Sequence, residues 1–223
     1  MTAFAPTFLP TYRPPLAMAA FPVKAPEQQW IRDIILVVAA SLVMAAVSQA
    51  SFNVPFSADR TGQLVPITGQ TFGVLLIGVT LGSRRAAAGV LAYLAWGWAG
   101  APFYASGGHG MTALYLGASS GYLWGFVVAA FVVGWLAEHG FDRGPWLVGA
   151  MLVGNGLIYV AGLPVLALWL NNTGLDLSVW NAGLWPFIPG DMAKLIAAAL
   201  VVPVAWAAVQ RFRPMDGTEP KNE

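Results

Sequence analysis

The sequence predicts an all-α, polytopic membrane protein that crosses the bilayer six times and has both termini in the cytoplasm. The composition points this way, because 57% of the residues are hydrophobic and only 9% are charged. The apolar residues are also gathered into six stretches. Backbone N–H and C=O groups in lipid must form hydrogen bonds within the protein, as they do in a helix or a closed barrel. The stretches lack the alternation of apolar and polar residues that is typical of a strand. We therefore expect each stretch to be a helix.

The six stretches differ in length. Roughly 20 apolar residues are needed to cross the hydrocarbon core. The second and third stretches are shorter and are separated only by residues 82–85, which predicts a tight helical hairpin. Their alanine and glycine content favours close packing between helices. The stretches cover residues 33–50, 67–81, 86–99, 115–137, 146–170 and 191–209.

Basic residues predict the orientation of the chain. With the N-terminus inside, nine basic residues fall on the cytoplasmic side, Arg60 falls in an outer connection and Lys194 enters a helix. Cytoplasmic loops of membrane proteins carry the excess of Lys and Arg. An even number of spans in a cell (inner) membrane, with cytoplasmic termini, satisfies this rule. The nine residues are Arg13, Lys24, Arg32, Arg84, Arg85, Arg143, Arg211, Arg213 and Lys221.

One domain is predicted, because no Pro/Gly/Ser linker separates two apolar cores. Residues 27–213 form the six-helix transmembrane domain, residues 1–26 form an N-terminal tail and residues 214–223 form a polar C-terminal tail. Repeated prolines in the first tail predict an extended segment, or one that lies on the membrane surface. These prolines are Pro6, Pro10, Pro14, Pro15, Pro22 and Pro26.

Several functions are excluded or unsupported. The chain has no cysteine, which excludes disulfides and cysteine-bound metals, and its two histidines do not make a metal site. A net charge of +1 gives no electrostatic case for nucleic acid. The phosphate-binding loop of nucleotide hydrolases and the common hydrolase motifs are missing. We therefore expect no cofactor, no metal and no enzymatic activity.

The strongest candidate site opens the last apolar stretch. Asp191 and Lys194 are three residues apart, which places them on one face of a helix. Ionisable groups at that depth usually face a cavity or a partner. The carboxylate is expected to accept N–H groups of a ligand while the ammonium donates to an acceptor. Two structural interpretations compete: Asp191 caps the helix, and Lys194 merely pairs with it or extends to water.

Three outer connections, residues 51–66, 100–116 and 171–190, are longer than the inner ones and predict a site near the outer face. Thr68 and Gln70, after the first connection, offer groups that both donate and accept, although capping explains them equally well. In the glycine-rich second connection, Phe103 and Tyr104 can wall an apolar ligand. His109 alone is weak evidence for a site.

Small and polar residues inside the stretches have two interpretations. Gly117, Gly121 and Gly125 recur every four residues and favour helix packing. Asn155 is either an interhelical hydrogen bonder or a residue of the binding site. Two small-residue pairs in the first stretch can serve internal packing or docking on another membrane protein. These pairs are Ser41 with Ala45 and Ala46 with Ala50.

Three ordered motifs resemble those of the BioY family, the biotin-binding substrate-capture (S) components of energy-coupling factor transporters. The motifs are VPITGQTFGVLLIGVTLGSRRAAAGVLAYLAWGWAGAPFYASGGHG, LGASSGYLWGF and PGDMAKLIAAAL. The resemblance covers residues 33–209. It departs from the family at residues 117–122, GASSGY, where members commonly carry GPTGGY; only Tyr122 and the glycines at 117 and 121 match there.

The resemblance implies a six-helix protein that captures biotin from outside. It implies that Asp191 and Lys194 contact the ureido group, and that Thr68, Gln70 and the loop near Phe103 complete the pocket. It also implies partners: a membrane coupling subunit with two cytosolic ATPases. Docking through the small residues of the first helix is then expected, with biotin as the transported ligand rather than a cofactor.

Two alternatives stay open at this point. The chain could capture another vitamin, because S components share one fold among different ligands. It could also be an integral-membrane enzyme, for which Asp191 and Lys194 are the acid–base candidates.

Overall fold

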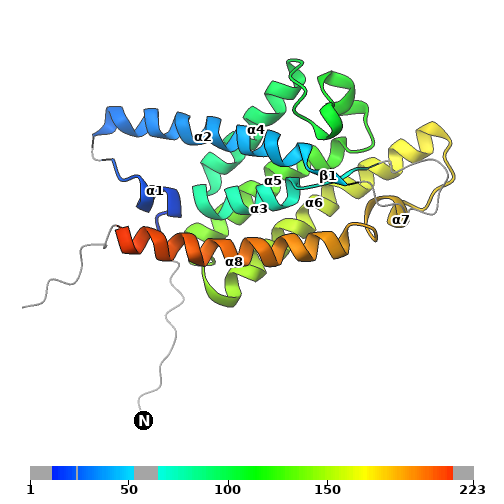
Figure 1. Ribbon diagram of the computed structural model, residues 1–223. Coiled ribbons are helices and arrows are strands. Elements are labelled where there is room, and N and C mark those ends of the chain that lie inside the picture. Colours follow the sequence, from blue (N-terminus) through cyan, green and yellow to red (C-terminus); the bar gives the residue numbers. More distant parts are fainter. Residues whose placement is uncertain (1–11, 24, 53–64, 213–223) are drawn as a thin grey trace, which may run out of the picture.

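The computed structural model describes residues 12–23, 25–52 and 65–212 of the chain, and most of them lie in helices (Figure 1). Arg60, Lys24, Arg213, Lys221 and the C-terminal tail, which entered the sequence-based predictions, lie outside the described residues. The elements are α1 (Leu16–Ala20), α2 (Pro26–Gln49), β1 (Ser51–Phe52), β2 (Ile67–Thr68), α3 (Gln70–Leu81), α4 (Ser83–Trp98), η1 (Ala105–Gly107), η2 (Thr112–Leu116), α5 (Ser120–Glu138), α6 (Gly144–Thr173), α7 (Val179–Gly183) and α8 (Ile188–Phe212).

Each predicted apolar stretch overlaps one helix of 12 residues or more, so the all-α prediction is confirmed. Four segments are long and apolar enough to cross a membrane: Pro26–Gln49, Ser120–Glu138, Gly144–Thr173 and Val179–Phe212. The helix α3 has 12 residues and α4 has 16. At 1.5 Å per residue these lengths are about 18 and 24 Å, short of a core roughly 30 Å thick. The six-span count therefore remains a prediction.

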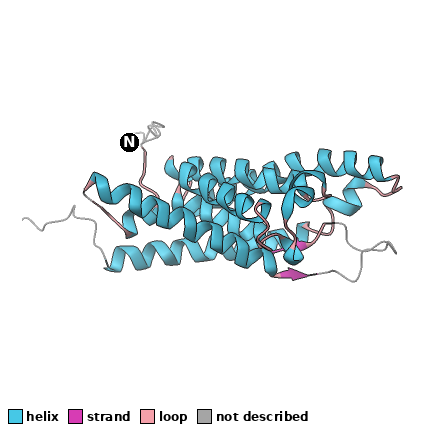
Figure 2. Ribbon diagram, turned by 90° about the horizontal axis from the view of Figure 1, so that it is seen from above, coloured by secondary structure: helices cyan, strands magenta, loops and turns pink. Residues whose placement is uncertain are grey.

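The helix α5 lies at the centre of the bundle, where it packs against α3, α4 and α6. The helix α2 covers α4, and α8 lies against α3. The long helices extend along the length of the molecule, with β1 and β2 in the half where α8 begins (Figures 1 and 2). These two strands pair antiparallel, with Ser51 opposite Thr68. The stretch predicted to begin at residue 67 therefore starts as a strand, and its helix begins at Gln70.

The bundle has two chemically different ends. At the first, Glu138 at the end of α5 accepts a 3.1 Å hydrogen bond from the Ser83 amide that begins α4. The guanidinium of Arg143 lies 4.1 Å from the ring centre of Trp206, near the end of α8. We call this the basic end, and the opposite end, with β1, β2 and residues 99–119 and 174–187, the loop end. Arg32 and Arg85 lie at the basic end in contact with Asp33, and Arg13 and Arg143 lie there in contact with Asp142. Arg84 is next to Arg85 at the start of α4, and Arg211 is in the last turn of α8.

The N-terminal segment differs from the extended tail that its prolines predict. Residues 16–20 form the short helix α1, which contacts α3 and α8 at the basic end. Pro15 immediately precedes this helix, where the fixed φ of proline is compatible with a helix start. Ala17 is buried, and the Arg13 amide donates to the Glu138 carbonyl at 2.7 Å. The segment between Pro15 and Pro22 has no proline of its own and can therefore form a short helix.

Candidate functional site

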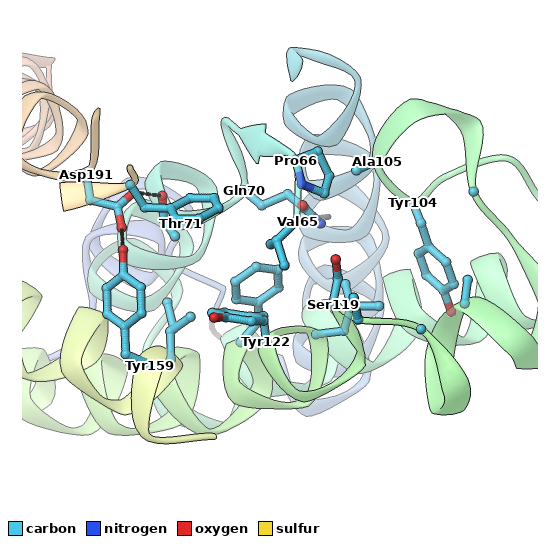
Figure 3. Close-up of a pocket in the computed structure, with 18 residues that line it drawn as sticks. Val65, Pro66, Gln70, Thr71, Tyr104, Ala105, Ser119, Tyr122, Tyr159 and Asp191 are labelled. Atoms are coloured by element: carbon cyan, nitrogen blue, oxygen red, sulfur yellow. Dashed lines mark hydrogen bonds between the residues drawn. The ribbon is translucent and has the colours of Figure 1, made fainter. Parts of the chain in front are cut away.

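A cavity of about 280 Å³ lies at the loop end between α3, α5, α6 and α8 (Figure 3). All three predicted outer connections contribute to its walls. Apolar and aromatic side chains dominate, and a few polar groups converge on the space, a combination typical of small-molecule sites. The lining residues are Val65, Pro66, Gln70, Thr71, Tyr104, Ala105, Gly108, Ala113, Gly117, Ala118, Ser119, Tyr122, Leu123, Phe126, Ile158, Tyr159, Phe187 and Asp191.

Asp191 lies at one end of the cavity and is buried (Figure 3). Its Oδ1 accepts hydrogen bonds from Thr71 Oγ1 and Lys194 Nζ, both at 3.0 Å, and its Oδ2 accepts one from the Tyr159 hydroxyl. The backbone amide of Asp191 donates to the Phe187 carbonyl at 2.8 Å, so the residue lies within the first turn of α8 rather than at its cap. Three helices therefore fix one carboxylate.

Lys194 lies behind this carboxylate and is not among the lining residues. Its Nζ is 3.0 Å from Asp191 Oδ1 and 3.2 Å from Thr71 Oγ1. The side chain is 19% exposed, whereas that of Asp191 is 3% exposed. The ammonium therefore neutralises the carboxylate, and the cavity is lined by an acid whose counter-charge belongs to the protein itself.

Gln70 lines the cavity from the first turn of α3, and its neighbours hold its amide. Its Oε1 accepts a hydrogen bond from Thr68 Oγ1 at 2.8 Å, and its Nε2 donates to the Tyr93 hydroxyl at 2.7 Å. Thr68 is buried but does not line the cavity. Thr68 therefore positions the amide, and one N–H of Gln70 is left to face a ligand.

Two tyrosines wall the cavity with their own hydroxyl groups already bonded. The Tyr122 hydroxyl donates to the Gly183 carbonyl at 2.9 Å, and the Tyr104 hydroxyl donates to the Leu94 carbonyl at 2.6 Å. Burial raises the pKa of Tyr104, in the second connection, to about 12, so its hydroxyl stays protonated near neutral pH. These rings supply apolar surface rather than reactive groups.

The end of the cavity far from Asp191 is formed at the start of α5. Gly117, Ala118 and Ser119 line it, and Ser119 is the N-cap residue of this 19-residue helix. The Ser119 side chain makes no cap hydrogen bond. The first amides of a helix lack partners within the helix and carry partial positive charge. This end can therefore receive an anionic group.

The structure separates the predicted site residues into three groups. Asp191, Gln70 and Tyr122 line the cavity, and Lys194 and Thr68 bond to lining residues. Phe103 contributes its carbonyl oxygen to a hydrogen bond from Ser48, and its ring is not on the cavity wall. Asn155 is one turn of α6 away from Tyr159, and its buried Oδ1 has no partner among the described residues.

The two small-residue pairs of α2 face in different directions. Ser41 and Ala45 are buried, and the Ser41 hydroxyl donates to the Val38 carbonyl at 2.7 Å. Ala46 and Ala50 are exposed. Only the second pair is therefore accessible to another protein.

Tyr159 and Ser119 belong to the cavity but were not predicted as site residues. A signal for Tyr159 exists in the sequence, because a phenol inside an apolar stretch usually finds a hydrogen-bond partner. Which partner it finds depends on the packing of α6 against α8. Ser119 has no such signal, since loop serines are common and only the fold places this one at the cavity.

Comparison with known proteins gives a consistent result. Residues 18–211 match the model of the BioY family. The "Biotin transporter BioY" of Rhizobium etli is 37% identical over 145 residues, covering 61% of this chain and 75% of that protein. That of Rhodobacter capsulatus is 38% identical over 162 residues, covering 67% and 81%. A crystal structure of the S-component for biotin from an ECF-type ABC transporter is similar in fold, with a TM-score of 0.61, 18% identity, and coverage of 87% of this chain and 97% of that chain.

Proposed function

This chain belongs to the BioY family, and from that premise we propose that it captures biotin as the S component of an energy-coupling factor transporter. Relatives that share more than a third of their aligned residues with it are named biotin transporters. The observation that carries the proposal is the cavity itself, where a buried carboxylate with its own counter-charge lies at one end of a largely apolar space. The chain is a transport protein and not an enzyme.

The acidic end of the cavity suits the ureido group of biotin. This group is neutral and presents two N–H donors and one carbonyl. A carboxylate offers about four acceptor positions, and protein donors occupy three of those on Asp191. The remaining position can accept one ureido N–H, and the remaining N–H of Gln70 can donate to the carbonyl. Lys194 acts through Asp191, whose charge it balances, rather than by touching the ligand.

The rest of the ligand follows the length of the cavity. Leu123, Phe126 and Ile158 offer apolar surface to the thioether ring. The valeryl chain then leads its carboxylate to Ser119 at the start of α5, where a hydroxyl and the positive end of the helix dipole favour an anion. This orientation gives the ureido carbonyl, one ureido N–H and the carboxylate of biotin each a partner of opposite character.

We place the protein in the cell membrane with six spans and both termini in the cytoplasm. The basic end would then face the cytoplasm and the loop end, with the cavity, the outside. The support is that most of the described arginines gather at the basic end through contacts with Asp33, Asp142 and Trp206, as expected for cytoplasmic loops. The short helices α3 and α4 would cross where the bilayer is locally thin.

Transport would be driven by separate subunits, a membrane coupling protein and two cytosolic ATPases. The chain lacks a phosphate-binding loop of its own. A surface for the coupling subunit is offered by α2, where Ala46 and Ala50 lie on the exposed side together with Leu42 and Val43. Small residues let two helices approach closely in lipid.

Titration of biotin into the detergent-solubilised protein tests the proposal. We expect saturable binding of unaltered biotin in preference to other vitamins such as thiamine and riboflavin. Preference for another vitamin would replace the ligand while keeping the transport role. Chemical conversion of labelled biotin would instead favour an enzyme, and absence of any binding would refute the capture function.

A further inference from the structure

The segment Gly100–Gly110, which joins α4 to η2, forms one wall of the cavity through Tyr104, Ala105 and Gly108. Its outer edge is loosely packed. A Cβ added at Gly100, Gly107 or Gly110 would meet nothing within 4 Å, and all three glycines have positive φ. The position of this wall therefore depends on contacts made elsewhere along the segment.

Contacts with α4 hold the segment from the inside. The Tyr104 ring packs edge-on against Tyr93, with ring centres 5.6 Å apart, and its hydroxyl bonds to the Leu94 carbonyl. The same Tyr93 accepts the hydrogen bond from Gln70, which lines the cavity. The buried Tyr93 therefore contacts both the Gln70 amide, which lines the cavity, and Tyr104, which forms part of the cavity wall.

The last two residues of α2 hold the segment from the outside. The Gln49 Nε2 lies 3.3 Å from the carbonyl oxygens of Pro102 and Phe103 and 3.2 Å from that of Tyr104. The Ser48 hydroxyl donates to the Phe103 carbonyl, and Gln49 also donates to Ser48 Oγ at 2.9 Å. Three consecutive carbonyls therefore face one side-chain amide from a helix that is distant in sequence.

We propose that Gln49 is a positioning residue that keeps this wall closed over the bound ligand and thereby sets the rate of ligand release. The inference rests on the proposed capture of biotin. Gln49 does not line the cavity, so its loss leaves the ligand contacts intact. Without the amide the segment opens more often, and a ligand escapes through each opening. Dissociation accelerates more than association slows, as for most changes within one binding site.

The substitution Gln49→Glu tests this, because it keeps the size of the side chain and replaces the donor by a group that the three carbonyls repel. Gln28→Glu is the matched control, since Gln28 is an exposed residue at the other end of α2. Release of labelled biotin is followed after addition of excess unlabelled biotin. We expect release from Gln49→Glu to be roughly three- to tenfold faster than from wild type. The control should release biotin at the wild-type rate.

Hydrogen exchange of the ligand-free protein gives a second readout that needs no biotin. Amides within residues 100–110, such as that of Tyr104, which donates to the Gly108 carbonyl at 3.0 Å, should exchange faster in Gln49→Glu, with the helices unchanged. Unchanged exchange there together with release within twofold of wild type would overturn the inference. Faster exchange throughout the bundle would assign Gln49 to general stability and would also overturn it. If wild type binds no biotin, the proposed function fails, and the exchange experiment alone still decides whether Gln49 holds the segment.

Discussion

Asp191 illustrates how a single ionisable residue is made tolerable inside a membrane domain. Its carboxylate accepts bonds from Thr71, Tyr159 and Lys194, which come from three different helices. A buried ion pair is strongly destabilised when one partner is removed, because the other is left uncompensated. The same contacts that stabilise the carboxylate also fix the direction in which it faces the cavity.

Asp191→Asn should weaken biotin binding while the protein still inserts and purifies. The neutral asparagine side chain lacks the charge that is proposed to orient the ligand, and it leaves Lys194 without the carboxylate with which it pairs. A hydrogen bond to a charged group contributes about 1.5–3 kcal/mol, which corresponds to a roughly 10- to 100-fold change in Kd. Calorimetric titration measures this change. Asp176→Asn, at an exposed acid of the loop end, is the control and should bind like wild type; equal affinity for the two variants would remove Asp191 from the site.

Ser119 tests the orientation of the ligand. If the biotin carboxylate lies at the start of α5, Ser119→Ala should weaken biotin binding about three- to tenfold through the loss of one hydrogen bond to an anion. Binding of biotin methyl ester, which has no carboxylate, should be much less affected. Competition binding with both ligands measures the difference, with Ser178→Ala as control. A loss of equal size for both ligands would argue against this orientation.

At the scale of elements, the spacing of glycines on α5 explains how the cavity is closed on the side of α6. A Cβ at Gly121 would lie 2.6 Å from Val165 Cβ and 2.7 Å from the Ala161 carbonyl oxygen. Gly125 meets Ala161 and Ile158 in the same way. Gly117, predicted to continue this stripe, lies before α5 and borders the cavity instead. The glycine stripe that packs against α6 therefore consists of Gly121 and Gly125, without Gly117.

Gly121→Ala should destabilise the protein, because the added methyl group must push α6 away from α5. Overpacking of this kind costs about 1–3 kcal/mol. Gly156→Ala on α6 is a matched control, since nothing lies within 4 Å of its added Cβ. Alanine is the better helix former, so this control should be neutral or slightly stabilising. Thermal unfolding in detergent compares the two, and an equal melting temperature for both would contradict the close packing of α5 on α6.

At the scale of the whole molecule, the loop end and the basic end differ in structure. The loop end holds the cavity, and the basic end is closed by α1, the Glu138 contact and the Arg143–Trp206 stack. A ligand that enters at the loop end therefore meets a packed bundle beyond the cavity. Release to the other side then needs a movement of the whole subunit or of its helices.

The absence of cysteine from the chain allows a direct test of orientation. Single cysteines are introduced as Asp176→Cys at the loop end and Gln210→Cys near the end of α8, both at exposed positions. A membrane-impermeant maleimide should label the first in intact cells and the second only after lysis, because basic ends face the cytoplasm. Labelling in the reverse order would invert the proposed topology, and labelling of both in intact cells would refute the crossing of the membrane by α8.

The sequence by itself determined the fold class and the approximate helix positions, and it predicted that the acid and amine that open α8 belong to a site. These features depend on local composition: apolar length predicts a helix in lipid, and a charge within it demands a partner. The three motifs of residues 33–209 further indicated the family. Asp191, Gln70 and Tyr122 were accordingly recognisable before any contact was known.

Only the tertiary structure decided which groups share the cavity. Tyr159 reaches Asp191 across 32 residues, Thr71 reaches it across 120, and Gln49 reaches the second connection across 53 to 55. The sequence also predicted Phe103 and Asn155 as site residues, yet their side chains do not line the cavity. Side-chain direction depends on how helices rotate and cross, and that is set by packing over the whole bundle rather than by the residues nearby in the chain.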